Sequence, residues 1–383
     1  MTSRSRRLDA LRQAASALSP EVVRLAIELA EVPAPTGGEY DRASRVCTLL
    51  RERGYAAQID DIGNVYARRG TVGGAALMLA AHTDTVFPAH TPLKFTQTRG
   101  RIVGPGVGDN ALGVAAVIGA FDLLDKLGIA TAVDLIFVAT VGEEGLGNLA
   151  GAKRALDRHA EETAAFVAVE GHNLGRVTCG GVGSVRWKLS VHGPGGHSWG
   201  GYGQPSAIHV LAQIITSLAA CAPPVHPKTT FNVGVISGGT SVNSIASEAS
   251  ALIDLRSTSE AALSQFTARL RREIQRVHVD GISVNIETIG ERPAGETARD
   301  HPLVTCAGDT LRALGIPPIF DSSSTDANVG MNRGIPSICI GISRGGGGHT
   351  LQEYIETDPI ATGLTQLAAL VIASAEQLQG SKA

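Results

Sequence analysis

The chain contains 383 residues, which is more than one hydrophobic core usually supports, so we expect two domains. Hydrophobic residues make up 43% of the sequence and charged residues 18%, a balance typical of a globular protein with well-buried sheets. The formal net charge of -3 argues against a general affinity for nucleic acid or for acidic membranes, and we expect neither as a partner.

The N-terminal segment and the cysteines predict a cytoplasmic protein. Basic residues near the N-terminus are followed by no apolar stretch of the kind found in secretory signals. The apolar run at 111–121 is far shorter than the roughly 20 residues that cross a bilayer. Five widely spaced cysteines without a C-x-x-C pair indicate reduced thiols, rather than a disulfide framework or a cysteine-ligated zinc site.

The first predicted elements belong to an α/β domain. A helical pattern over 21–56 is broken in the middle by the Pro-Gly stretch VPAPTGGEY. Short apolar runs follow at 75–82, 133–140 and 164–170, and helices are predicted at 111–127 and 149–160. This alternation predicts a mostly parallel sheet that is covered by helices on both faces. The functional loops of such a sheet follow the carboxyl ends of its strands.

The pattern changes after Val182, where a second domain is predicted. Its expected order is strand, helix, two strands, helix and strand, at 184–193, 206–220, 229–239, 248–257, 262–277 and 282–290. This β-α-β-β-α-β order is that of the split βαβ sandwich. The α/β pattern then resumes with a helix at 302–314, a strand at 336–342 and a helix from residue 362. We therefore expect one domain formed by 1–181 and 294–383, with 182–293 inserted into it.

The glycine-rich loop GPGVGDNALG, residues 104–113, has two interpretations. Gly106, Gly108 and Ala111 match the loose G-x-G-x-x-A form of a dinucleotide-binding turn, whose amides hold a pyrophosphate at a helix N-terminus. Asp109 lies in the middle of this turn, where its carboxylate would repel phosphate. The loop therefore either holds an anion or presents the Asp109 carboxylate to a cation.

Acids and histidines follow two of the predicted strands. His82 and Asp84 end the first strand on one face, so the acid can orient a histidine that ligates a metal. Taken alone, a histidine and an acid at this spacing more often form a structural hydrogen bond than part of a metal site. Glu143 and Glu144 follow the second strand, and a buried pair could divide into a metal ligand and a proton acceptor. Taken alone, this pair fits a solvated turn better.

Taken together, five side chains predict a metal centre. Each of them follows a strand or a glycine loop of the same domain, where an α/β sheet collects its ligands: His82, Asp109, Glu144, Glu170 and His349. Two histidines and three carboxylates suit hard to borderline divalent cations, and five ligands suit two ions that share a bridging carboxylate. Asp109 is the natural bridge, so we favour the cation interpretation of the glycine loop.

The chain resembles the family-20 zinc metallopeptidases, the superfamily of peptidase T, acetylornithine deacetylase, succinyl-diaminopimelate desuccinylase, aminoacylase and the glutamate carboxypeptidases. The resemblance covers nearly the whole chain and rests on the order and spacing of HTDTV, GVGDNALG, GEEGLGN, VEG, GPGGHSW, GGTSVNSI, DLRS, STDAN and GGGGHTLQEY. It implies a zinc-exopeptidase-like sheet with an inserted, ferredoxin-like dimerisation or lid domain.

The resemblance also implies roles for the residues of the metal centre. One ion would be held by His82, Asp109 and Glu170, and the other by Asp109, Glu144 and His349. The ions would be zinc, with cobalt or manganese as alternatives. Asp84 would support His82, Glu143 would be the general base, and the peptide bond after Asp109 would be cis.

Three residues of the inserted domain match substrate-handling positions of the family. In a homodimer, His197 would reach the partner's active site and stabilise the oxyanion, while Asn243 and Arg256 would bind the substrate's carboxylate or scissile carbonyl. From the residues alone, His197 could equally be a loop histidine in a glycine turn, and Arg256 could be a surface ion pair.

We therefore expect a cytoplasmic di-zinc amide hydrolase, an exopeptidase on short peptides that dimerises through the inserted domain. The alternative is an N-acyl amino acid deacylase of acetylornithine deacetylase or desuccinylase type. DNALG lacks the lysine that often follows the bridging acid in the family, and Glu170 stands where many deacylases have aspartate. Two alternative functions of other kinds are a nicotinamide-dependent dehydrogenase and a non-catalytic binding protein with the same fold.

Overall fold

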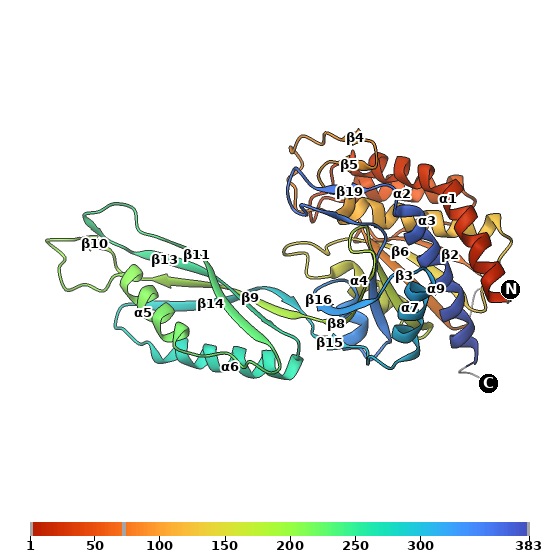
Figure 1. The fold of residues 1–383 in the computed structure, drawn as a ribbon. Coiled ribbons are helices and arrows are strands. Elements are labelled where there is room, and N and C mark those ends of the chain that lie inside the picture. The colour runs from red at the N-terminus through yellow and green to blue at the C-terminus, as the bar shows by residue number, and fades with distance from the viewer. Residues whose placement is uncertain (1–2, 71–73, 381–383) are drawn as a thin grey trace. The chain divides into compact units, whose positions relative to one another are not determined.

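The computed structural model describes residues 3–70 and 74–380 (Figure 1). The chain divides into two compact units. Unit 1 contains the chain up to Gly181 and again from Glu296, and unit 2 contains Val182–Gly295. Unit 2 is therefore inserted into the sequence of unit 1.

A mostly parallel sheet forms the centre of unit 1, as expected. β3 pairs in parallel with β6 and β7, and β17 pairs in parallel with β7, while β2 and β8 join the sheet antiparallel. The strand order is β1-β2-β6-β3-β7-β17-β8-β15, with β16 paired to β8. The bounds are β1 Gln58–Ile59, β2 Val65–Arg69, β3 Ala76–His82, β6 Asp134–Thr140, β7 Thr163–Glu170, β8 Arg176–Gly181, β15 Gly295–Glu296, β16 Ile319–Ser323 and β17 Ser337–Gly341.

Helices cover both faces of this sheet, which explains why its central strands are apolar throughout. Alternate residues of β3 enter two different cores: Leu77 and Leu79 pack in one, and Met78 and Ala80 in the other. The first core is formed with α1 Ser3–Ala30, α2 Tyr40–Glu52, α3 Leu112–Lys126, α7 Pro302–Ala313 and α9 Ile360–Gly380. The second core is formed with α4 Ala150–Arg158 and α8 Ala327–Asn332.

The first helix of unit 1 differs from the sequence expectation. α1 begins at Ser3 rather than near residue 21 and continues through Pro20, because Leu11 and Ala15 pack into the first core. The apolar helical segment is longer than the run at 111–121. Among the described residues, one segment, Val107–Lys126, is long and apolar enough to cross a membrane, but 89% of its apolar window is buried inside the protein. Core helices of water-soluble proteins pass the same test.

Short elements that the sequence did not predict surround the carboxyl ends of the central strands. A small antiparallel sheet has the order β18-β19-β5-β4, with bounds Gly345–Gly346, Tyr354–Glu356, Arg101–Val103 and Thr96–Thr98. Its register pairs Tyr354 with Val103. A kinked segment, η1 Val107–Ala111, leads from this sheet into α3, and its Asp109 and Asn110 have non-helical backbone angles. The small sheet thus joins the segment before the glycine loop to the segment after His349.

Unit 2 is a four-stranded antiparallel sheet with two helices. The strand order is β11-β13-β9-β14, which places the first strand of the unit, β9, between β13 and β14. Apolar residues at helical spacing on α5 and α6 pack with the buried Trp187 and Leu189 of β9. A short β10–β12 ladder adds to the unit. The bounds are β9 Gly183–His192, β10 Gly196–His197, α5 Ala207–Ala219, β11 Thr229–Gly238, β12 Ser244–Ile245, β13 Glu248–Ser257, α6 Glu260–Arg276 and β14 Ser283–Arg292.

Candidate metal centre

Parallel pairing brings three functional segments to one edge of the central sheet. His82 is the last residue of β3 and lies beside Thr140, the last residue of β6. Glu170 is the last residue of β7, which flanks β3 on the other side. Glu143 and Glu144 follow β6 after a glycine turn, and each is 6% exposed. The carboxyl ends of these strands therefore carry the predicted ligands, as in other open α/β sheets.

Asp109 lies between the two histidines. Its Oδ1 is 3.0 Å from His82 Nε2 and its Oδ2 is 3.2 Å from His349 Nε2. His82 Nε2 is also 3.6 Å from Glu170 Oε2, and His349 Nε2 is 3.2 Å from Glu144 Oε1. The five side chains thus form two groups, each with its possible ligand atoms within 4.8 Å of one another, and Asp109 belongs to both groups.

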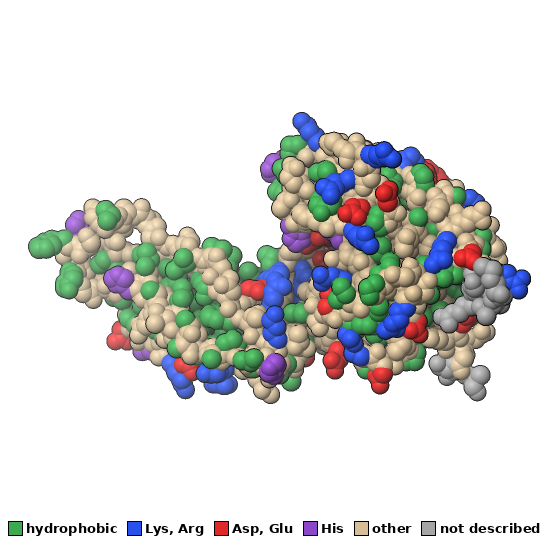
Figure 2. Space-filling model, viewed as in Figure 1, with side chains coloured by type: hydrophobic (Ala, Val, Ile, Leu, Met, Phe, Trp, Pro, Cys, Tyr) green, Lys and Arg blue, Asp and Glu red, His purple; other side chains and the backbone are tan. Residues whose placement is uncertain are grey.

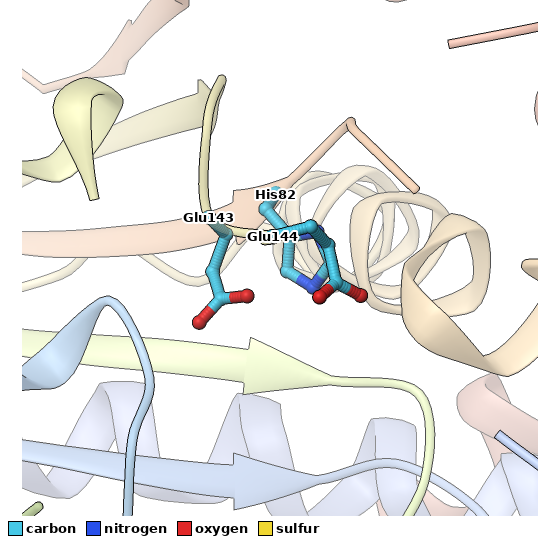
Figure 3. Close-up of side chains that lie close together, drawn as sticks. All are labelled: His82, Glu143 and Glu144. Carbon is cyan, nitrogen blue, oxygen red and sulfur yellow. The ribbon is translucent and has the colours of Figure 1, made fainter. Parts of the chain in front are cut away.

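Glu143 lies next to these groups with its carboxylate turned aside. Figure 3 shows Glu144 and His82 side by side, with the carboxylate of Glu143 set apart from them. His82, Glu143 and Glu144 still offer atoms within 4.8 Å of one another. Glu143 is therefore close enough to exchange a proton with a group held at the centre, while Glu144 faces the histidines.

Asp84 contacts more of the centre than its position behind His82 suggested. Its two carboxylate oxygens accept hydrogen bonds from the backbone N–H groups of Glu143 and Glu144, at 3.0 and 2.8 Å. Nδ1 of His82 lies 3.1 Å from the Asp84 carbonyl oxygen and 3.5 Å from its carboxylate. Asp84 therefore fixes the turn that carries Glu143 and Glu144, and its main chain orients the imidazole of His82.

The electrostatics of the five residues suit cations. Burial raises the pKa of Glu170 to about 7. Burial and the charge of Asp109 also raise the pKa of Glu144. The hydrogen bond to Asp109 raises the pKa of His349 to about 9. Three carboxylates this close repel one another when ionised, and divalent cations would neutralise them. The nitrogen and oxygen donors suit divalent cations, and the residues form two candidate ligand sets.

The glycine loop does hold an anion, but that anion is a side chain of the protein. The carboxylate of Glu353, which is fully buried, accepts hydrogen bonds from the N–H groups of Gly106, Gly108 and Asp109. Glu353 belongs to the motif GGGGHTLQEY, in which only His349 was predicted to have a role. Its partner lies more than 240 positions earlier in the chain, and no local pattern connects the two.

Asn110 is a second residue that sequence reasoning missed. The peptide bond between Asp109 and Asn110 is cis, as the resemblance implied. The buried Asn110 side chain donates to the carbonyl of Val169 and accepts from the N–H of Gly171, at 2.8 and 2.9 Å. These two groups lie on either side of Glu170. Asn110 therefore connects the loop of Asp109 to the strand end of Glu170.

The three predicted substrate residues lie in unit 2. His197 is exposed and pairs with Ser244 in the β10–β12 ladder. The neighbouring N–H of Ser198 donates to the carbonyl of Asn243, so His197 and Asn243 are close together. Arg256 forms an ion pair with Asp254 at 2.8 Å. Within unit 2, Arg256 therefore forms an ion pair, which was the alternative to a role in substrate binding.

Comparison with known proteins assigns the chain to a family. The family model described as peptidase family M20/M25/M40 matches residues 78–373. The chain belongs to this family. It is 31% identical to the succinyl-diaminopimelate desuccinylase of Corynebacterium glutamicum over 199 residues, which are 50% of this chain and 52% of that relative. The chain thus spans about half the length of that relative in the match.

Solved structures of known peptidases share the fold. The aminopeptidase PepT of Bacillus cereus has a TM-score of 0.77 and 22% identity, over 94% of this chain and 99% of that protein. The YxeP protein of Bacillus subtilis, described as a dinuclear metal binding peptidase from the M20 family, has a TM-score of 0.69 and 16% identity, over 94% and 99%. At these identities the likeness shows the fold alone. The amides of the glycine loop bind the side chain of Glu353 rather than a pyrophosphate, and the chain belongs to M20. Both observations argue against the dehydrogenase interpretation of this loop.

Proposed function

We propose that this M20 protein is a di-metal hydrolase of amide bonds, an exopeptidase that acts on short peptides. The observation that carries the proposal is the position of Asp109, whose two oxygens face His82 and His349. Glu170 completes one set of ligand atoms and Glu144 completes the other. A shared carboxylate between two such sets is the arrangement expected for a pair of divalent ions. We propose zinc for both, with cobalt and manganese as substitutes.

The chain's own residues would divide the work of hydrolysis. When bound, the ions supply Lewis-acid activation of the scissile carbonyl and of the attacking water. Glu143 accepts a proton from that water at its carboxylate and passes it to the leaving amine. Asp84 keeps Glu143 in place through the backbone of the turn. The near-complete burial of Glu143 keeps bulk water away from this proton transfer.

The proposed substrate is a short peptide, and an N-acyl amino acid is the alternative. The family model, described as a peptidase family, supports the first, and the sequence match to a succinyl-diaminopimelate desuccinylase supports the second. His197 and Asn243 would contact the reacting carbonyl, and Arg256 would bind a free carboxylate of the substrate. Their roles rest on the family resemblance.

We also propose a homodimer that forms through unit 2. β11 is an edge strand of the unit 2 sheet, and its Val235 and Ile236 are 52% and 60% exposed. An exposed apolar edge strand is open to pairing with another chain. Figure 2 shows further hydrophobic side chains on the surface of unit 2. The five free, buried cysteines support a reducing compartment, and we place the protein in the cytoplasm.

Metal content and hydrolysis together test the proposed function. The purified protein is analysed for metals by mass spectrometry, and a panel of dipeptides, tripeptides and N-acetyl amino acids is assayed before and after chelation. We expect about two divalent ions per chain, with activity that is lost on chelation and restored by zinc or cobalt. The panel then selects between peptidase and deacylase. A reconstituted protein that binds no metal would show that the five-ligand assignment is wrong.

The variant Glu143→Gln tests the general base separately. Glutamine keeps the size of the side chain but accepts no proton at neutral pH, so kcat should fall about 10²–10⁴-fold. Metal content should stay at the wild-type value, because Glu143 is outside both proposed ligand sets. A variant with wild-type kcat would refute the role of Glu143 and leave the metal assignment intact.

A further inference from the structure

Glu353 is attached to the glycine loop by its side chain and its main chain. Its Oε2 accepts from Gly106 N–H at 2.8 Å, and its Oε1 accepts from the N–H groups of Gly108 and Asp109, both at 2.7 Å. The carbonyl oxygen of Glu353 accepts from Gly104 N–H, also at 2.8 Å. The next residue, Tyr354, begins strand β19 and pairs with β5 just before the loop. Glu353 therefore fixes the main chain that carries Asp109.

His172 connects the same point to the segment of Glu170. Its Nε2 lies 3.7 Å from Glu353 Oε1 and 3.2 Å from the carbonyl oxygen of Tyr354. His172 follows Glu170 by two positions and packs against Gly108, where an added Cβ would lie 2.0 Å from its ring nitrogen. Glycine at 108 thus lets the imidazole reach the loop. The segments that carry Asp109, Glu170 and His349 all meet at Glu353.

A buried carboxylate at this position is costly, and its hydrogen bonds show what it does. Transfer of an ionised carboxylate from water into the protein interior is unfavourable, and the negative charge of Asp109 is nearby. Three charge-assisted hydrogen bonds offset part of this cost. Replacement of a whole buried ion pair by well-packed apolar residues is often neutral or stabilising in other proteins, but removal of Glu353 alone would leave three buried N–H groups unpaired. The carboxylate does one thing that an apolar side chain could not, which is to hold three amides of the loop.

We propose that Glu353 is a positioning residue of the metal centre. Its two oxygens set the course of the main chain from Gly106 to Asp109. As a result, Oδ1 of Asp109 faces His82 and Oδ2 faces His349. Because Glu353 follows His349 by four residues, it also ties the segment of that ligand to the Asp109 loop. This inference rests on the proposed function of the five ligands, but Glu353 belongs to neither ligand set.

The variant Glu353→Gln tests this role with little change in volume. Glutamine has one acceptor oxygen, and its NH₂ group would face at least one of the three N–H groups that the carboxylate now accepts from. The affinity for the more weakly held ion should fall about 10–100-fold, as for other residues that support metal ligands. Competition with a chromophoric chelator measures this affinity for zinc and cobalt. The visible spectrum of the cobalt protein reports the ligand geometry and should change.

A matched control is Glu162→Gln. Glu162 directly precedes β7, at the opposite end of the strand from Glu170, and its partly buried carboxylate accepts from Arg68 at 2.7 and 2.8 Å. This variant should lower the unfolding temperature and leave the metal affinity and the cobalt spectrum unchanged. A comparison of the two variants separates general destabilisation from a loss of ligand position.

The outcomes distinguish this inference from the proposed function. If the wild-type protein binds two ions and Glu353→Gln has the same affinities and cobalt spectrum, Glu353 has no positioning role. If the wild-type protein binds none, the metal assignment fails and the inference fails with it. Should Glu353→Gln not fold, Glu353→Asp keeps the charge but is one methylene shorter. It should weaken metal binding in the same direction, and wild-type binding by this variant would overturn the proposal.

Discussion

Two of the loops that bring ligands to the metal centre are held by their amides on buried carboxylates. In the turn after β6, the consecutive N–H groups of Gly142, Glu143 and Glu144 donate to Glu39 and Asp84. In the glycine loop, three N–H groups donate to Glu353 alone. The two loops differ in the number of acceptor side chains and in where these lie in the sequence.

The surroundings of the carboxylates also differ. A buried arginine, Arg42, lies near Asp84 and Glu39 and donates to the carbonyl of Thr83 at 2.8 Å. Burial would raise the pKa of Asp84, but His82 and its hydrogen bonds lower it overall. Burial raises the pKa of Glu353 to about 7. The carboxylates that hold the turn after β6 thus have the positive charge of Arg42 nearby. The carboxylate of Glu353 has only amide N–H groups and the imidazole of His172 among the contacts described above. We expect the first loop to be the more rigid.

The largest effect is expected at Asp84, because this side chain contacts both the base and a ligand. In Asp84→Asn, one acceptor oxygen is lost and an NH₂ group faces the N–H of Glu143 or Glu144. Displacement of Glu143 should lower kcat about 10²–10⁴-fold. In contrast to Glu143→Gln, metal content should fall as well, since Glu144 moves with the turn. Steady-state kinetics and metal analysis measure the two effects. Wild-type kcat in this variant would show that Asp84 does not position the base.

A smaller effect is expected at Asn110, which links the glycine loop to Glu170. Asn110→Ala leaves the N–H of Gly171 and the carbonyl of Val169 without this partner in a buried site. Each unpaired group costs about 1–3 kcal/mol of unfolding free energy. Metal affinity should also fall about 10-fold as Glu170 loses support. Asn110→Asp can still accept from Gly171, but its carboxylate would face the Val169 carbonyl oxygen in a buried site, so it should be at least as damaging as alanine. Urea unfolding measures the stability, and chelator competition measures the metal affinity. Equal metal affinity in the wild type, Asn110→Ala and Asn110→Asp would show that Asn110 does not support Glu170.

The contrast between the loops also explains what the sequence could predict. His82, Glu144 and Glu170 could be predicted because parallel strands end at one edge of a sheet, and each of them lies at or just after such an end. Asp109 and His349 could be predicted because each lies in or behind a glycine loop of the same domain. Asp84 was identified because it is two residues from a ligand. Glu353 and Glu39 were not, since their partners are distant in the chain and only the fold brings them together.

Short elements were missed for a related reason. Strands of two or three residues, such as β5 and β19, are too short to show a period of two. They form by pairing within the small sheet beside the glycine loop. The longer strands and helices of unit 2 have clear periods, and their predicted ranges lie within a few residues of the observed ones. Hydrophobic periodicity therefore predicts the long strands and helices, but it does not predict the long-range hydrogen bonds that position the ligands.

The smallest effect is expected at Glu39, where two substitutions compare the loops directly. A single oxygen of Glu39, Oε1, accepts from both Gly37 and Gly142, at 2.9 and 3.1 Å. Glu39→Gln keeps one acceptor oxygen and should remain within about 0.5 kcal/mol of the wild type. Glu39→Ala leaves both N–H groups unpaired and should lose about 1–3 kcal/mol of unfolding free energy.

Glutamine should therefore be tolerated at position 39 and not at position 353, where both oxygens are used. Urea unfolding of the four proteins, with glutamine or alanine at each position, tests this difference. If Glu39→Gln is as damaging as Glu39→Ala, the charge of Glu39 beside Arg42 holds the turn rather than its acceptor oxygen. The two loops would then be fixed by different physical means, ion pairing in one and hydrogen-bond geometry in the other.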